Sequence, residues 1–344
     1  MTYLRVSVLS LIALMLLLHA CGSKPQISAP LQQNLVWPSP PASARVGYVR
    51  AFSHPKDLGI EKGFLKILSE FIMGSEEIEM IRPMSVVVTA NKVIYVADPG
   101  IQGIHRFDML SGEYSVIRQK ENIPLPSPIA LTQGKNKQVY VVDSQLAKIF
   151  RIDATAGYVK AVNLQGTLKQ PTGLVINNKD GRYYVLDTSA HQLKIFNADG
   201  ALYKSIGQRG NGNAEFNYPT HIWLDKKGEL YITDSLNFRI QVLDTQGKFI
   251  RKFGQLGDGS GNMSRPKGVT TDGKGRVYVV DALFNALQIF DQQGRLLLPI
   301  GQRGQAAGEF WLPTGIFLSD DGDIYVADSH NHRVQVFRLL GETS

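Results

Sequence analysis

The sequence predicts an all-β fold built from six similar units of four strands, and three observations lead to this prediction. A pattern of Tyr, then Val or Ile, then any residue, then Asp occurs six times, as in "ELYITD" and "DIYVAD". A proline stands fifteen or sixteen residues before each of these aspartates, and the units repeat every 44 to 47 residues. Repeats of about 40 to 50 residues with four strands each are typical of propeller blades. The sequence therefore predicts a six-bladed β-propeller with four-stranded blades.

Each unit contains four strand-like segments that are separated by turns. In the fourth unit the first segment, "HIWLDKKG", is apolar and ends at a glycine that permits a positive φ. The second segment ends at the repeated aspartate, the third is "RIQVLD", and the fourth, "KFIRKFG", follows the turn "DTQG". Short apolar or alternating segments between such turns are typical of β-strands.

The last unit has only three strand-like segments before the sequence stops at Ser344. The segment "RVGYVRAF" at residues 45–52 can supply the missing outer strand from the other end of the chain. Such a strand would close the ring and leave no open edge between the first and last blades. The sequence therefore predicts one propeller domain over residues 45–344.

The N-terminus predicts export and lipid attachment. After Arg5, thirteen largely apolar residues run from Val6 to Leu18, which is the length of a signal-peptide core rather than of a membrane span. The run ends in Leu-His-Ala-Cys, which resembles a bacterial lipobox with Cys21, the only cysteine, as the lipidated residue. We expect a signal peptide at 1–20 and a Pro-rich tether at 21–44. An ordinary secretory signal with a nearby cysteine is the alternative.

The predicted export decides how the positive charge is interpreted. The net charge of +7 and the pI near 9.3 would make nucleic acid a candidate partner inside a cell, and export excludes it. The basic residues are spread over many positions, which favours contact with anionic envelope components. Gly22 is not an aspartate, and by resemblance to enterobacterial lipoproteins this favours the outer membrane, facing the periplasm.

The whole arrangement resembles the NHL-repeat family of six-bladed propellers, in a bacterial lipoprotein form. The lines that carry the resemblance best are "YPTHIWLDKKGELYITDSLNFRIQVLDTQGKFIRKFG" and "LPTGIFLSDDGDIYVADSHNHRVQVF". An aspartate repeated in every blade is expected to accept hydrogen bonds from loop N–H groups and to pair with Arg239 or Arg333. This structural role is predicted for all six: Asp98, Asp143, Asp187, Asp234, Asp281 and Asp328.

Residues that break the repeat are the better functional candidates. The second residue after each proline is small in five units but is His221 in the fourth, at the start of an innermost strand. This place near the channel mouth suits a ligand contact or a metal ligand, and packing beside Trp223 is the alternative. His191, four residues after Asp187, can pair with His221. Lyases of the resembled family hold zinc with several histidines, and the other strand starts here offer none.

The remaining histidines and one unmatched segment lead to further expectations. His330 and His332 fall in the two variable positions of an Asp-Ser-x-Asn-x-Arg loop and are expected to be exposed. His105 aligns with Lys194 and with three glutamines at strand positions that we expect to face outward. Apolar residues at helical spacing predict a helix near 60–74, which would cap the channel mouth, present a ridge to a partner or pack on the rim.

Two functions follow, and the sequence favours the first. It is a non-enzymatic, membrane-tethered envelope scaffold, a monomer without a cofactor, whose Gly-rich connectors bind a protein, peptide or glycan. The alternative is a periplasmic lyase or hydrolase with a divalent metal such as Zn or Ca at the channel mouth and His221 as its central ligand. The sequence contains no Gly-x-Ser-x-Gly, no phosphate loop and no cysteine nucleophile.

Overall fold

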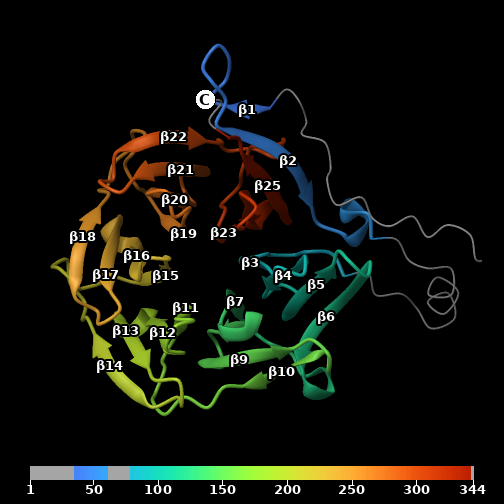
Figure 1. Ribbon diagram of the computed structural model, residues 1–344, viewed down its shortest axis with the longest axis vertical. Helices are drawn as coiled ribbons and strands as arrows, with labels where there is room; N and C mark the ends of the chain where they lie inside the picture. Colours follow the sequence, from blue (N-terminus) through green and yellow to red (C-terminus); the bar gives the residue numbers. More distant parts are fainter. Residues whose placement is uncertain (1–34, 61–77, 342–344) are drawn as a thin grey trace, which may run out of the picture.

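The computed structural model describes residues 35–60 and 78–341, and these form a six-bladed β-propeller (Figure 1). The fold class predicted from the repeat is confirmed. In the order of the blades, the strands are β3 (Ser85–Val88), β4 (Val93–Asp98), β5 (Gly103–Asp108) and β6 (Glu113–Gln119); β7 (Pro128–Gln133), β8 (Val139–Asp143), β9 (Lys148–Asp153) and β10 (Tyr158–Ala161); β11 (Pro171–Ile176), β12 (Tyr183–Asp187), β13 (Gln192–Phe196) and β14 (Leu202–Ile206); β15 (Pro219–Leu224), β16 (Glu229–Asp234), β17 (Arg239–Asp244) and β18 (Phe249–Phe253); β19 (Pro266–Thr271), β20 (Arg276–Asp281), β21 (Ala286–Asp291) and β22 (Leu296–Ile300); and β23 (Ile316–Leu318), β24 (Asp323–Asp328), β25 (Arg333–Leu339) and β2 (Val46–Phe52).

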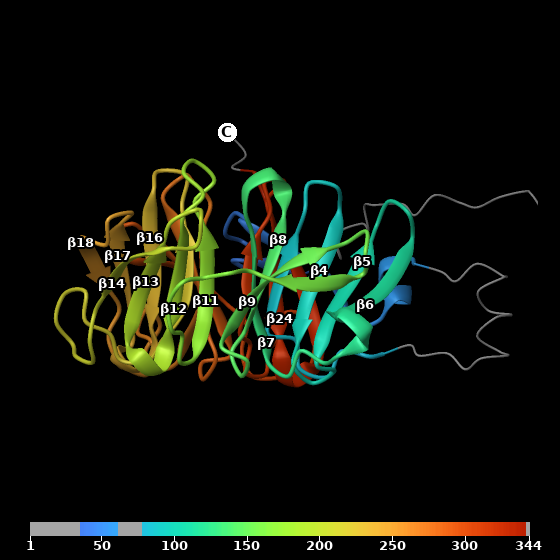
Figure 2. The ribbon, with the colours of Figure 1, turned by 90° about the horizontal axis from the view of Figure 1, so that it is seen from below.

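The strands run between two faces of the ring, as the edge-on view in Figure 2 shows. One face carries the connections from each fourth strand to the next first strand, such as residues 207–218 and 254–265, and the loops between second and third strands. We call it the connector face and the opposite one the turn face. Short 3₁₀ turns occupy loops on both faces: η1 (Pro55–Leu58), η2 (Lys120–Asn122), η3 (Lys135–Lys137), η4 (Thr188–Ala190), η5 (Ser235–Asn237) and η6 (Ser329–Asn331).

The ring is closed by the strand predicted for this purpose. Strand β2 pairs antiparallel with β25, from Val46 opposite Leu339 to Phe52 opposite Val334. A further short strand, β1 (Val36–Trp37), pairs with β2, so two residues of the predicted tether belong to the last blade. The Trp37 ring packs against Phe337 with the centroids 5.6 Å apart, and this apolar contact explains why the segment adds to the sheet.

The blades are not all separate four-stranded sheets, and some predicted features cannot be located among the described residues. The outer strands β6 and β10 pair in parallel, so the first two blades form one eight-stranded sheet. The predicted signal peptide, the lipidation site Cys21 and most of the predicted helix lie outside the described residues. Within those residues, no helix is long and apolar enough to cross a membrane.

The core lies between the blades rather than at the axis. Each sheet packs its apolar side chains against the sheets of its two neighbours, so strands in the middle of a blade are buried on both faces. At the junction of the last and first blades, the Phe52 ring packs edge-on against Phe107 at 5.7 Å, and both side chains are buried. The closing strand is therefore held by side-chain packing as well as by its ladder of hydrogen bonds.

The closing strand gives the first testable prediction. Phe52→Ala is expected to lower the free energy of unfolding by about 3–5 kcal/mol, because it leaves a cavity at the junction. The matched control is Leu202→Ala, also on a fourth strand, whose side chain is exposed and should matter little. Urea unfolding followed by fluorescence measures both variants. Equal losses of unfolding free energy for the two variants would show that the packing of Phe52 does not stabilise the closing junction.

Candidate functional site

The repeated aspartates form the framework beneath the connector face. Asp234 is fully buried and accepts hydrogen bonds from the N–H of Asn217 at 2.6 Å and from Arg239 Nε at 2.8 Å. Arg239 also donates to the carbonyl oxygens of Asn211 at 2.7 Å and of Gly212 at 2.9 Å. The same pattern joins Asp328 and Arg333 to the connector of the last blade. Each buried carboxylate thus ties its loop to the connector that precedes it.

His105 belongs to this framework, and the expectation that it faces outward is wrong. Its side chain is fully buried, with Nδ1 2.8 Å from the Tyr114 hydroxyl and Nε2 3.4 Å from Asp98. The equivalent residues of four other blades are also buried, and three of them contact their own aspartates: Lys194, Gln241 and Gln335. At this position of the third strand, neighbouring blades pack on both sides, so the side chain does not meet solvent. A search for period-2 alternation cannot find this, because it assumes one solvated face.

The surroundings of two of these aspartates favour their charged forms. Burial alone would raise the pKa of Asp98, but hydrogen bonds from His105 and from the N–H groups of Ile81 and Arg82 outweigh it and lower the pKa. Burial likewise opposes ionisation of Asp187, and a 2.8 Å bond from Lys194 Nζ helps to hold its pKa below the ordinary value. These carboxylates are structural anions whose hydrogen-bonding capacity is used within the blade.

His221 lies between two innermost strands. Its Nδ1 accepts a hydrogen bond from the Val269 N–H of the next blade at 3.3 Å, and Trp223 Nε1 donates to Thr271 Oγ1 of that blade at 3.0 Å. In the first blade, Ser85 at the equivalent position accepts from the Leu131 N–H at 3.1 Å. His221 therefore performs a task that a serine performs elsewhere in the ring, which favours its packing role.

The protonation state of His221 agrees with this contact. Burial lowers its pKa to about 4, because the charged imidazolium would lose its hydration between the blades. A nitrogen that accepts a backbone N–H must also be unprotonated. Both observations describe a neutral ring at neutral pH.

His191 is on the connector face and contacts the fourth blade. Its Nδ1 accepts from the Tyr218 N–H at 3.2 Å, and the Tyr218 ring packs edge-on against it at 4.7 Å. Asn285 Oδ1 accepts from the Leu312 N–H at 2.9 Å at the equivalent junction. Within the described part of the chain, no hydrogen bond or ring contact joins His191 to His221. Residues 35–60 and 78–341 also contain no group of three or more His, Cys, Asp or Glu side chains placed to hold a metal ion.

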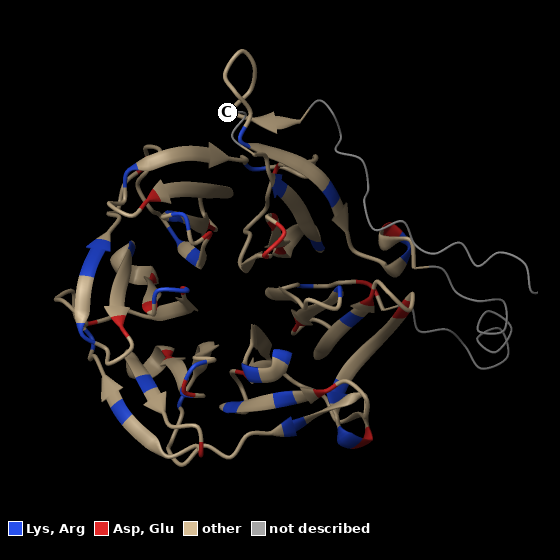
Figure 3. Ribbon diagram, in the orientation of Figure 1, with Lys and Arg blue, Asp and Glu red and all other residues tan. Residues whose placement is uncertain are grey.

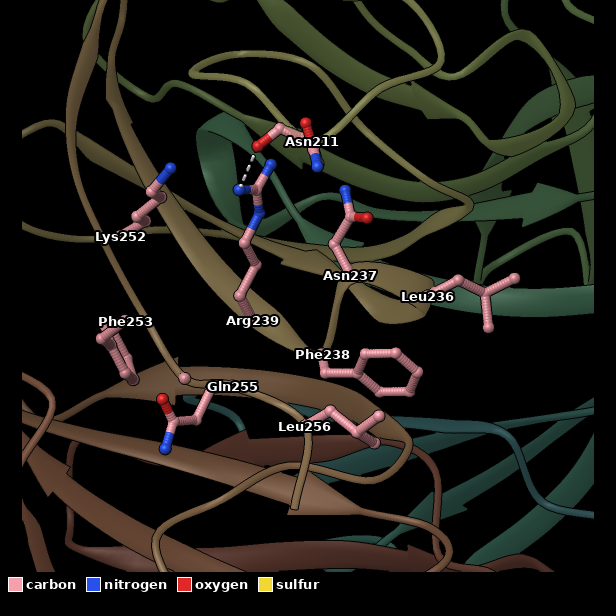
Figure 4. Close-up of a pocket in the computed structure, with 10 residues that line it drawn as sticks. Asn211, Leu236, Asn237, Phe238, Arg239, Lys252, Phe253, Gln255 and Leu256 are labelled. Carbon is pink, nitrogen blue, oxygen red and sulfur yellow. Dashed lines mark hydrogen bonds between the residues drawn. The ribbon is translucent and has the colours of Figure 1, made fainter.

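A groove opens on the connector face between the fourth and fifth blades (Figure 4). Its volume is about 540 Å³, and its apolar side chains are Leu236, Phe238, Phe253 and Leu256. Polar side chains border it: Asn211, Asn237, Arg239, Lys252 and Gln255. The guanidinium of Arg239 is held by Asp234 and the Asn211 carbonyl, so this wall of the groove is fixed.

The groove residues were not predicted as a site, although the sequence carried a signal. Leu236 and Phe238 occupy the same variable loop positions that hold His330 and His332 in the last blade. Those two histidines are exposed, as expected. In the fourth blade both free positions are apolar and face the same groove, so together with Leu256 they form a contiguous apolar surface.

Lys267 is a second residue that sequence reasoning missed. It follows the proline that begins strand β19, so it lies on an innermost strand. Burial and, to a smaller degree, the charge of Arg265 lower the pKa of its amine. Thr220, at the equivalent position of the fourth blade, has a buried hydroxyl without a hydrogen-bond partner among the described residues.

Together, the ring of blades and the aspartate framework define the class: a six-bladed β-propeller. The comparisons add the repeat type. A family model described as a six-bladed β-propeller matches residues 132–230, and a model of the NHL repeat matches residues 310–337, in the last blade. The chain is therefore a six-bladed β-propeller that carries an NHL repeat, as the sequence indicated.

Known proteins resemble this chain in fold. A streptogramin B lyase structure superposes with a TM-score of 0.58 at 16% identity. The superposition covers 77% of this chain and 95% of the lyase chain. An auxiliary nutrient binding protein from Bacteroides thetaiotaomicron gives 0.60 at 15% identity, over 75% of this chain and 69% of that one. The E3 ubiquitin-protein ligase NHLRC1 of Homo sapiens is 32% identical over 59 residues, which are 17% of this chain and 15% of that relative. At these values the likenesses show the fold alone.

The role of His221 leads to a prediction about pH. Because its folded-state pKa of about 4 lies below the ordinary value of 6.5, its contribution to stability is complete above pH 6.5 and is lost as the pH falls toward 4. His221→Ser keeps an acceptor for the Val269 N–H and removes the titration. Between pH 7.5 and 4.5 the natural protein should lose about 2 kcal/mol more unfolding free energy than this variant. Urea unfolding at both pH values measures the difference. An equal loss of unfolding free energy in the natural protein and in the variant would contradict the packing role.

The framework gives a prediction about charge. Asp234→Ala is expected to lower the free energy of unfolding by about 3–5 kcal/mol, because Arg239 is left buried without its counter-charge. Replacing both residues, as Asp234→Ala with Arg239→Met, should recover part of this loss. Urea unfolding of the two variants makes the comparison. A double variant that is no more stable than the single one would show that the ion pair is not the main contribution of Asp234.

Proposed function

We propose that this protein is a binding scaffold of the bacterial envelope that engages its partner through the groove on the connector face. The groove is the observation that carries the proposal, since its leucine and phenylalanine side chains lie on loops fixed by the buried aspartates. An apolar lining with amide and ammonium groups at its border suits a peptide or glycan segment that is apolar on one side and polar on the other. A protein partner that presents such a segment fits equally well.

The place of action is part of the proposal. The lipobox-like sequence at Cys21 supports attachment by a lipid, and Gly22 supports the outer membrane with the propeller in the periplasm. The superposed nutrient binding protein supports a binding role for a fold of this kind. The alternative metal-dependent lyase needs three protein ligands and an open position, and no observation on the described residues favours it.

The test uses two equivalent leucines. Leu236 lines the groove, whereas Leu283 is at the same position of the next blade, is exposed and is absent from the lining. The full-length chain, purified in a non-ionic detergent, is immobilised and incubated with solubilised envelope proteins and with peptidoglycan fragments. Leu236→Asp is expected to weaken retention of the bound partner about tenfold, because a carboxylate would replace an apolar contact.

Leu283→Asp is the control and should bind as the natural chain does. Both variants are first compared by thermal unfolding, so that a loss of binding is not a loss of fold. The proposal fails if Leu236→Asp retains the same partner at the same affinity, or if both substitutions weaken retention equally.

A further inference from the structure

Four cationic side chains surround the propeller axis on the connector face. Each is within two residues of a proline that precedes or begins an innermost strand: Arg82, Lys169, Arg265 and Lys267. The innermost strands pack against one another around the ring, so these positions encircle the axis. They belong to the first, third and fifth blades and therefore alternate with blades that carry no cation there. Figure 3 shows charged residues on every blade, so it is their place at the starts of the innermost strands that sets these four apart.

None of the four side chains has an ion pair or a hydrogen bond among the described residues. Their backbone groups do: the N–H groups of Arg82, Lys169 and Arg265 donate to Asp98, Asp187 and Asp281 respectively. The backbone positions are thus fixed, while the charged groups bond to no protein group within residues 35–60 and 78–341. Most other arginines around the ring, such as Arg239, Arg251 and Arg333, pair with an acid.

Acidic residues are absent from the surrounding positions of the described chain. The two residues before each of the six prolines, the residue after it and the four residues after each repeated aspartate include no Asp or Glu. Asp281, in the same blade as two of the cations, accepts N–H groups of Ser264, Arg265, Leu283 and Phe284. Its hydrogen-bonding capacity is used by the backbone, and neither cationic side chain contacts it.

A neighbouring hydroxyl lacks the partner that its equivalents have. Thr172 and Thr314 follow the prolines of the third and sixth blades, and each bonds to the hydroxyl after its own aspartate, Thr188 or Ser329. Thr220 holds this position in the fourth blade, on strand β15, which packs against the strand β19 that carries Lys267. Its Oγ1 is buried without a hydrogen-bond partner among the described residues. A buried hydroxyl without a hydrogen bond is costly, so this junction of two innermost strands is not built for hydrogen bonding within the framework alone.

We propose that the axis on the connector face is a binding site for a small polyanion that carries two or three carboxylate or phosphate groups. Cationic residues of three blades stand around one axis, an arrangement that matches several negative groups on one molecule better than a single anion. The Lys267 amine forms the inner, less solvated part of the site, and Arg82, Lys169 and Arg265 form its exposed border. The site is separate from the groove, since none of these residues lines it.

Calorimetric titration of the full-length chain in detergent tests the site, with citrate as the tricarboxylate probe and inorganic pyrophosphate as the phosphate probe. Saturable binding of one molecule per chain is expected for at least one probe. Arg265→Gln should weaken it about two- to fivefold, the range of an exposed charge pair. Lys267→Met should weaken it more, about tenfold, because the amine is less exposed to water.

The matched control removes two cations elsewhere. Lys179 and Lys274 are exposed on the turn face, and their side chains form no ion pair among the described residues, so Lys179→Gln with Lys274→Gln lowers the net charge without touching the axis. This variant should bind within about twofold of the natural chain at physiological salt. Equal weakening by the control, or no saturable binding of either probe at millimolar concentration, would overturn the proposal.

Two further readouts keep the test decisive. If Lys267→Met does not fold, Arg82→Gln takes its place, and citrate should protect Lys267 of the natural chain from acetylation by acetic anhydride. Unchanged acetylation with a saturating probe would contradict the site. A response to citrate alone assigns a polycarboxylate, and a response to pyrophosphate alone assigns a phosphate-bearing ligand. Leu236→Asp should bind the probe normally, so failure of the groove and failure of this site are distinguishable.

Discussion

The structure depends on a buried aspartate carboxylate at the end of the second strand of each blade. A buried anion is costly unless hydrogen-bond donors surround it, and here these donors come from the connector that leads into the same blade. Each aspartate therefore joins two segments about seventeen residues apart, at a point where the chain has no regular structure of its own. Because most of the donors are backbone N–H groups, the connector side chains do not determine whether the contact forms. The repeat fixes the backbone of the connector face and leaves its chemistry free to change.

The contacts between blades follow the same rule. The hydroxyl of Thr188 donates to the Pro219 carbonyl oxygen of the next blade, and Ser235 donates to Pro266 in the same way. Side chains that differ in type perform equivalent tasks elsewhere, as His221 and Ser85 do for the N–H groups of their neighbours. What must be constant is an acceptor or donor at a fixed distance from a neighbouring strand, not a particular residue. A histidine that is the only one of its kind in a repeat is therefore not by that fact a ligand.

The fold could be predicted from the sequence because its information is repeated six times: the period, the prolines and the Tyr-x-x-Asp pattern each state the blade again. The closing strand could also be predicted, since a blade with three strands needs a fourth. Other features depend on partners that are distant in sequence. The burial of His105 follows from a blade on each side, and the short strand at Val36 follows from the Trp37 ring meeting Phe337. The groove and Lys267 emerge only when loops of different blades are placed side by side.

The distribution of cations shows how a repeat can gain a site without losing its fold. In the third, fourth and sixth blades a Lys or Arg is used to compensate the buried aspartate. In the fifth blade backbone N–H groups satisfy Asp281, so the arginine and lysine beside Pro266 have no structural partner there. Keeping unpaired cations close together is unfavourable to folding, and burial together with the smaller effect of Arg265 lowers the pKa of Lys267. The framework does not require these unpaired cations, and we therefore attribute them to the binding of an anionic ligand.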